Sequence, residues 1–357
     1  MKKLILSSII FIFIFSACEK TPKSKNWNQN ALFPDSAVNL GDINSQYDDY
    51  NSVLPETHFG KALIFSSNRR TSGSDFDLIY EPFHAAWYWD NGELVVDNSY
   101  YWQETNWVMK LLSQIPGTGN QYGPYCIGID TIIDGKNNRI NLLAYSNNKG
   151  SYTFQEEFVY NISTDAGASW STKGPFSIAG ISDSERQYIS FYSPNVFSID
   201  DYGLNPDKFT QMYFNKTSSG KSKIYRLNIP DSLSFLQFLS DSVEYPQEIV
   251  PELNSEGNDF CPFVNGNFMV FTSDRAGGFG GYDLYYSNFD GTSWSEPINF
   301  GEKINTAYDE FRPVPVNVSE FKNDLMIFSS NRPGGLGGFD LYYVGIDKFV
   351  PQIIVDK

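Results

Sequence analysis

The stretch Phe328-Ser-Ser-Asn-Arg-Pro-Gly-Gly-Leu-Gly-Gly-Phe-Asp-Leu-Tyr-Tyr343 occurs three times in this chain. The second copy is Phe271-Thr-Ser-Asp-Arg-Ala-Gly-Gly-Phe-Gly-Gly-Tyr-Asp-Leu-Tyr-Tyr286, and a divergent copy is Phe65-Ser-Ser-Asn-Arg-Arg-Thr-Ser-Gly-Ser-Asp-Phe-Asp-Leu-Ile-Tyr80. Each copy carries an arginine followed eight residues later by an aspartate: Arg69 and Asp77, Arg275 and Asp283, Arg332 and Asp340. An internal repeat of this kind predicts a repeat architecture.

The repeat extends to both sides of this motif. Before it lies a shared element that ends in an acid and an aromatic residue, with Asp49, Asp259 and Glu310 at the acidic position. A short continuous apolar run then predicts a strand that is buried on both faces. A glycine-rich turn, a second aromatic strand and a turn into an outer strand complete the unit. Four consecutive antiparallel strands per repeat are typical of one blade of a β-propeller.

The same pattern, in weaker form, covers the middle of the chain. We therefore expect an all-β protein that forms a single propeller of four-stranded antiparallel blades. Five blades begin near Tyr47, Tyr125, Gln187, Asp259 and Glu310. Residues 85–124 are interpreted as the outer hairpin of blade 1 and an insertion with a short helix near 105–114, with a sixth blade as the alternative.

The two ends of the chain compete to close the ring. The segment Val38-Asn-Leu-Gly41 matches Ile298-Asn-Phe-Gly301, which is the expected outer strand of blade 4. We therefore expect the strand near 33–40 to complete the last blade, because closure removes an exposed strand edge. The alternative outer strand is Phe349–Val355.

One turn in the middle of the chain has a recognisable pattern. Ser163-Thr-Asp-Ala-Gly-Ala-Ser-Trp170 resembles the Asp-box of sialidase-type propellers, which implies that Ser163, Asp165, Gly167 and Trp170 form a structural turn. The three main repeats in turn resemble the WD40-like propeller repeats (PD40) of the Tol-Pal periplasmic propeller and of Bacteroidota envelope proteins. That resemblance implies a non-catalytic binding scaffold.

The N-terminus has the features of a targeting segment. Lys2 and Lys3 precede an apolar run that is too short to span a bilayer and that ends at Cys18. The pattern resembles a bacterial lipobox, which implies a lipoprotein signal peptide over residues 1–17, lipidation of Cys18, a tether over 18–32 and a propeller domain over 33–357. We expect an outer-membrane lipoprotein on the periplasmic side, held to the membrane by its lipid alone.

The repeated charges suggest a structural role. Asp49, Asp259 and Glu310 recur in the same blades as Arg69, Arg275 and Arg332, and blades 2 and 3 lack a clear acid. We expect each arginine to pair with an acid of its own or a neighbouring blade and to join the blades, because its planar fork suits a carboxylate. Catalytic carboxylates need dissimilar environments, so repeated acids favour a protein that is not an enzyme.

The densest aromatic cluster supplies the candidate binding residues Trp87, Trp89, Trp102 and Trp107, for which packing is the alternative. Cys126 and Cys261 are expected to be separate buried thiols, with a disulfide as the alternative. The formal net charge of −16 argues against a nucleic-acid partner, and two distant histidines argue against a metal site. No cofactor is expected. The sequence thus favours a module that binds an envelope protein; the alternatives are a glycan-binding lipoprotein and a five-bladed glycoside hydrolase.

Overall fold

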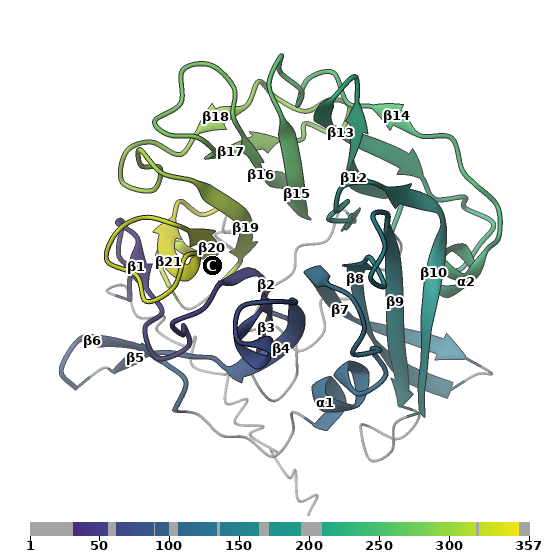
Figure 1. The fold of residues 1–357 in the computed structure, drawn as a ribbon, viewed down its shortest axis with the longest axis horizontal. Coiled ribbons are helices and arrows are strands. Elements are labelled where there is room, and N and C mark those ends of the chain that lie inside the picture. Colours follow the sequence, from purple (N-terminus) through teal and green to yellow (C-terminus); the bar gives the residue numbers. More distant parts are fainter. Residues whose placement is uncertain are drawn as a thin grey trace, which may run out of the picture.

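The computed structural model describes residues 31–55, 62–88, 90–99, 106–133, 136–163, 171–193, 209–318 and 321–349. These residues form five sheets around a common axis and a separate two-stranded sheet, and the chain runs once round the ring (Figure 1). The predicted five-bladed, all-β propeller is confirmed. The predicted signal peptide and Cys18 lie outside the described residues. Among the described residues, no helix has the length and apolar character needed to cross a membrane.

The blades follow the sequence in order. Blade 1 contains β2 (Asp49–Val53), β3 (Ala62–Ser67) and β4 (Asp77–Pro82). Blade 2 contains β7 (Gln121–Ile133), β8 (Lys136–Asn147), β9 (Phe154–Ser163) and β10 (Ser171–Asp183). Blade 3 contains β11 (Ser190–Tyr192), β12 (Gln211–Ser218), β13 (Lys221–Asn228) and β14 (Glu248–Ile249).

The last two blades carry the clearest copies of the motif. Blade 4 contains β15 (Asp259–Asn265), β16 (Phe268–Ser273), β17 (Asp283–Asn288) and β18 (Ile298–Asn299). Blade 5 contains β19 (Glu310–Val316), β20 (Asp324–Ser330), β21 (Asp340–Ile346) and, from the other end of the chain, β1 (Val38–Asn39). The closure predicted from the N-terminal strand is therefore confirmed: Val38 pairs with Tyr343 and Asn39 with Tyr342.

Blade 1 differs from the prediction. Its sheet has three strands, and the expected outer hairpin, β5 (His84–Tyr88) and β6 (Glu93–Asp97), forms a separate two-stranded sheet at the edge of the molecule (Figure 1). Phe83, which lies between β4 and β5, where the chain leaves the sheet, is fully buried in the core. The insertion then forms α1 (Asn106–Leu112), as expected, and α2 (Phe235–Ser240) follows β13.

The second strands of the three motif blades lie in the core. Every residue of β3, β16 and β20 is buried, which explains why the sequence shows continuous apolar runs there rather than alternation. The two described cysteines, Cys126 and Cys261, are both free and buried, so the disulfide alternative is wrong.

The glycine-rich turns make the joints between blades. Tyr282 N donates to Asp309 Oδ1 at 3.1 Å, and Glu310 N donates to Tyr282 O at 2.7 Å, so the turn of blade 4 bonds to the loop leading into blade 5. A side chain on Gly280 would place its Cβ 2.1 Å from Tyr308 O. Glycine is thus required there because two backbones approach closely. The turn of blade 5 repeats the arrangement on blade 1 through Phe339, Asp48 and Gly337.

The repeated arginines lie beside these joints. Arg69, Arg275 and Arg332 contact Asp49, Asp259 and Glu310 of their own blades, with Nη2–oxygen distances of 2.8, 2.7 and 3.0 Å. The same Nη2 atoms donate to carbonyls of the loop arriving from the preceding blade, Ile43 O, Leu253 O and Ile304 O, each at 2.7 Å. Each pair therefore lies within one blade and binds the linker to its neighbour.

Candidate functional site

The five inner strands share one irregular position near the axis. An aromatic residue precedes it in four blades, Tyr50, Tyr122, Phe260 and Phe311, and Gln187 occupies the equivalent place in blade 3, where Asn215 N donates to Gln187 O. The residue at this position has a positive φ in every blade: Asn51, Gly123, Tyr188, Cys261 and Arg312, with φ between 45° and 58°. In blades 1, 2, 4 and 5 the strand pairing shifts register at this point, as in a β-bulge, which re-aims side chains.

These re-aimed side chains meet at the axis. Asn51 Nδ2 donates to Tyr188 Oη at 3.2 Å, and the Arg312 guanidinium lies 5.3 Å from the centre of the Tyr188 ring. A Cβ on Gly123 would lie 2.3 Å from that ring, so glycine makes room for it. Four non-glycine residues hold a left-handed conformation here, and such strained positions cluster at functional sites.

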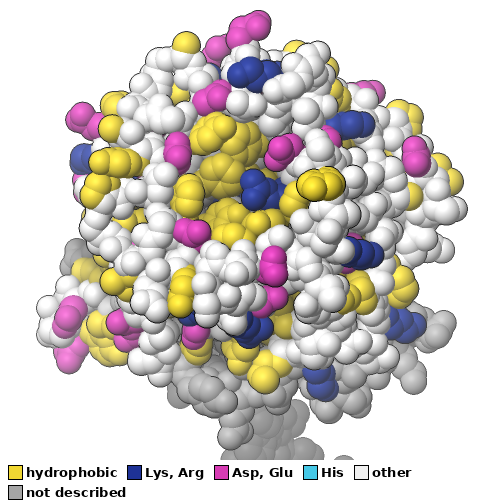
Figure 2. Space-filling model, in the orientation of Figure 1, with side chains coloured by type: hydrophobic (Ala, Val, Ile, Leu, Met, Phe, Trp, Pro, Cys, Tyr) yellow, Lys and Arg dark blue, Asp and Glu magenta, His cyan; other side chains and the backbone are white. Residues whose placement is uncertain are grey.

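A ring of aromatic side chains surrounds the axis above these residues. Tyr50 contacts Phe76 at 5.1 Å, Tyr122 at 5.9 Å and Phe339 at 5.6 Å between ring centres. On the other side Phe311 contacts Phe260 at 4.9 Å. The full ring, which we call the axial basin, comprises Phe76, Tyr50, Tyr122, Phe154, Phe260, Tyr282, Phe311 and Phe339. Figure 2 shows it as a hollow lined with apolar and aromatic side chains, with basic atoms inside it and acidic side chains around its rim.

The ring of aromatics is interrupted at blade 3. There Arg186 stands where blades 1, 4 and 5 have an acid, and Gln187 stands where the other blades have an aromatic. The Arg186 guanidinium lies 4.6 Å from the centre of the Tyr122 ring, and its Nη1 donates to Tyr50 Oη at 3.2 Å. Gln187 is buried, and neither its Nε2 nor its Oε1 has a partner. Blade 3 therefore provides the polar wall of the basin.

A second polar layer lies beneath the basin. Arg312 is fully buried; its Nη2 donates to Pro124 O at 3.2 Å, while Nε and Nη1 have no partner. Glu156 is also fully buried, and its Oε1 accepts from Ser146 Oγ and from Gln187 N. Burial raises the pKa of Glu156 to about 7, although these hydrogen bonds and the Arg312 charge favour its ionised form. An acid that titrates near neutrality therefore lies close to the axis.

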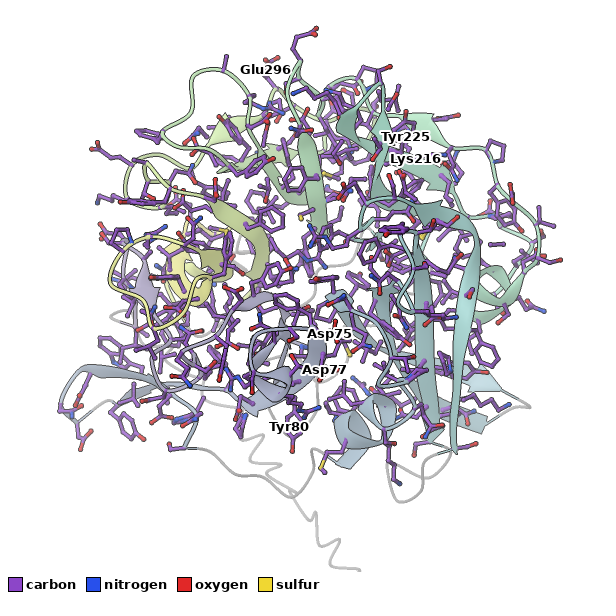
Figure 3. The ribbon with its side chains drawn as sticks, viewed as in Figure 1. Asp75, Asp77, Tyr80, Lys216, Tyr225 and Glu296 are labelled. Atoms are coloured by element: carbon purple, nitrogen blue, oxygen red, sulfur yellow. The ribbon has the colours of Figure 1, made fainter. Side chains whose placement is uncertain are left out.

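Further carboxylates approach the basin from its rim. Figure 3 shows Asp75, Asp77 and Tyr80 following one another outward from the axis along blade 1. The negative charge of Asp75 reaches Tyr122, where it adds to burial in raising the pKa of that phenol. Within the described residues, no group of three or more His, Cys, Asp and Glu side chains could hold a metal ion.

The tryptophans selected from the sequence lie elsewhere. Trp107, on α1, is 8% exposed and belongs to the core, and Trp87, on β5, is half-buried against it. These two residues pack, which is the alternative left open by the sequence. Trp89 and Trp102 lie outside the described residues. Of the Asp-box, Ser163 ends β9, and Asp165, Gly167 and Trp170 lie outside the described residues.

Sequence reasoning missed the basin itself. None of its aromatics is among the candidate residues from the sequence, although the aromatic before the motif aspartate recurs as Phe76, Tyr282 and Phe339. The inverted charge at Arg186 was the available signal, because aligning the blades by their acidic position places an arginine there.

Comparisons with known proteins are limited to structure. No protein-family model matches the chain, and no curated protein matches it. Among solved structures, it is similar to the catalytic domain of Coprinopsis cinerea GH62 α-L-arabinofuranosidase, at 12% identity over 89% of this chain and 98% of that one, with a TM-score of 0.46. It is also similar to the GH43_1 enzyme of Xanthomonas citri, at 7% identity over 87% of this chain and 91% of that one, with a TM-score of 0.44. A third similar structure is an α-L-arabinofuranosidase of Lactobacillus brevis, at 10% identity over 86% of this chain and 94% of that one, with a TM-score of 0.41.

These likenesses concern the fold alone. The expectation from the sequence that this protein is not an enzyme is contradicted, because the matched chains are enzymes. That expectation is not retained.

Proposed function

We propose that the protein binds a carbohydrate in the axial basin. The observation that supports this most directly is the nearly continuous aromatic ring around a hollow at the axis. Aromatic faces stack on the C–H faces of sugars, and a few fixed polar groups then orient the hydroxyls. Tyr50, Tyr122, Arg186 and Gln187 supply such groups within the same ring.

The test is a glycan array followed by calorimetry with the best-binding glycan. Phe339→Ala removes one half-buried wall of the basin and is expected to weaken binding at least 10-fold, since stacked aromatics dominate binding energies. Tyr88→Ala, at a 45% exposed aromatic of the peripheral hairpin, is the matched control and should bind normally. Unchanged affinity in Phe339→Ala, with both variants folded, would contradict binding in the basin.

Hydrolysis of the bound glycan is a second candidate function. Glycosidases use one carboxylic acid that stays protonated near neutral pH together with a second carboxylate. Glu156 has the raised pKa, and Asp75 lies at the basin. The measurement is release of reducing ends from the glycan identified on the array. Glu156→Gln and Asp75→Asn should each lower this rate at least 100-fold; activity that survives both substitutions would exclude this pair.

We also propose that the chain is a lipid-anchored envelope protein related to the PD40 repeats. The support is the N-terminal sequence and the triplicated motif. Cys18→Ala should shift the protein from the membrane to the soluble fraction of the native cell. An unchanged membrane fraction would rule out this anchor.

A further inference from the structure

Two arginines at the axis differ from all the repeated arginines in their partners. Arg69, Arg275 and Arg332 each contact a fully buried carboxylate. Among the described residues, neither Arg186 nor Arg312 contacts a carboxylate: Arg186 bonds to Tyr50 Oη and Arg312 to Pro124 O. The chain has a formal net charge of −16, so two cations at the axis without a carboxylate contact run against its overall charge.

The two guanidinium groups share an aromatic neighbour, although Arg186 belongs to the wall of the basin and Arg312 to the layer beneath it. Both lie near the Tyr188 ring, at 6.0 Å for Arg186 and 5.3 Å for Arg312. Arg312 has no exposed surface, and its Nε and Nη1 have no hydrogen-bond partner among the described residues. A buried cation without a counter-charge is costly, and such groups are normally paired. Glu156 interacts with the charge of Arg312 but makes no ion pair with it.

The basin wall offers the donors that an anion needs. Arg186 Nη1 donates to Tyr50 Oη, the guanidinium also interacts with the Tyr122 phenol, and Arg186 makes no ion pair with a carboxylate among the described residues. In a guanidinium group, Nε and Nη2 present their N–H groups along one edge of the plane. A carboxylate fits such an edge with two parallel hydrogen bonds. The surrounding aromatic ring excludes water and would strengthen the interaction.

We infer that the axial basin takes a carboxylated sugar, of the uronic-acid class, with its carboxylate on Arg186 and within the field of Arg312. This inference rests on the proposed carbohydrate binding and specifies its ligand. The aromatic faces of the ring would hold the pyranose, and the arginines would select the charge.

The experiment compares each uronate with its own uncharged form. Oligogalacturonate, oligoglucuronate and oligomannuronate are titrated by calorimetry as free acids and as methyl esters, which keep the size and remove the charge. At least one free acid is expected to bind 10 to 100 times more tightly than its ester, as charge-assisted hydrogen bonds imply. That preference should shrink as salt is raised from low to physiological concentration.

Variants locate the effect. Arg186→Gln should remove the preference for the free acid, and Arg186→Lys should keep a part of it, since it retains charge without the fork. Arg226→Gln, in the same blade at the exposed pair with Glu248, is the matched control and should change nothing. Thermal unfolding of each variant establishes that it is folded. If Arg186→Gln does not fold, the preference of Arg186→Lys for the free acid over the ester becomes the test of the inference.

Each other result has a distinct meaning. Equal binding of acid and ester, or binding of neutral glycans only, would leave carbohydrate binding intact and overturn the anionic ligand. Binding of sulfated but not carboxylated glycans would overturn the uronate assignment. Binding of an oligoglutamate peptide with no glycan binding at all would overturn both the inference and the proposed function.

Discussion

The blade joints and the axis use the same side chain in opposite ways. At the joints, Arg275 and its counterparts are held by a carboxylate, a linker carbonyl and an aromatic face, and each of them contacts one fully buried acid. At the axis, Arg186 and Arg312 rest on aromatic faces without a carboxylate contact among the described residues. The difference teaches that the repeated charges of this chain belong to the framework, and that the charges that break the repeat lie at the axis.

The largest effect is expected where a joint is broken. Arg332→Ala leaves the fully buried Glu310 without its cation, so we expect a loss of about 3 to 5 kcal/mol in the free energy of unfolding. Arg275→Ala should cost less, because Lys223 Nζ remains 3.6 Å from Asp259. Denaturant unfolding of the two variants provides the comparison, and full stability of both would contradict a structural role for the pairs.

The next effect concerns the acid below the basin. The pKa of Glu156 is raised from its ordinary value of 4.5 to about 7 in the fold, so the folded state binds this proton more tightly than the unfolded state. The contribution of Glu156 to the free energy of unfolding is therefore fully present below about pH 4.5. It falls as pH rises toward 7, by on the order of 2 to 3 kcal/mol.

Glu156→Gln should remove this part of the pH dependence. The measurement is denaturant unfolding of the wild type and the variant between pH 5 and 8, because other groups titrate equally in both. Arg312 and Glu157 also act on Glu156, the first lowering and the second raising its pKa. Identical pH slopes in the two proteins would show that Glu156 is ionised throughout.

A smaller effect is expected from filling the axis. Gly123→Ala would place its Cβ 2.3 Å from the Tyr188 ring at a φ of 58°, and overpacking of this kind costs about 2 kcal/mol. Gly334→Ala is the control: its φ is 94°, nothing lies within 4 Å, and only the backbone cost of about 1 kcal/mol applies. Equal losses in the two variants would mean that Tyr188 can move aside without cost.

The smallest effect is expected from removing an axial charge. Arg186→Met keeps the length of the side chain and removes a cation that has no carboxylate partner, so stability should change by less than about 1 kcal/mol, in contrast to Arg332→Ala. Thermal and denaturant unfolding without ligand provide the measurement. A loss as large as that of Arg332→Ala would place Arg186 in the framework and end the contrast between joint and axis.

The framework was predictable because it is repeated and local. The spacing of Arg275 and Asp283, the apolar runs and the match of Val38–Gly41 to a later outer strand led to the blades and to their closure. The basin could not be predicted from the sequence, because it is built from single positions in five strands that are far apart in the chain. Tyr50 and Phe311 contact each other only once the ring exists, at 6.5 Å. Blade 1 departs from the four-strand pattern at Phe83, a buried core residue after which the chain leaves the sheet.

Because β1 closes the ring by pairing with β21, the nascent chain holds β1 without its partner until β21 has been synthesised. The strand β1 is among the first parts of the domain to be synthesised, and its partner β21 is the last strand. Phe33, whose N and O atoms both bond to the side-chain amide of Asn323, must wait almost as long. At about 5 to 20 residues per second, the first strand remains unpaired for roughly 15 to 60 s. The ring therefore cannot close until β21 has been synthesised.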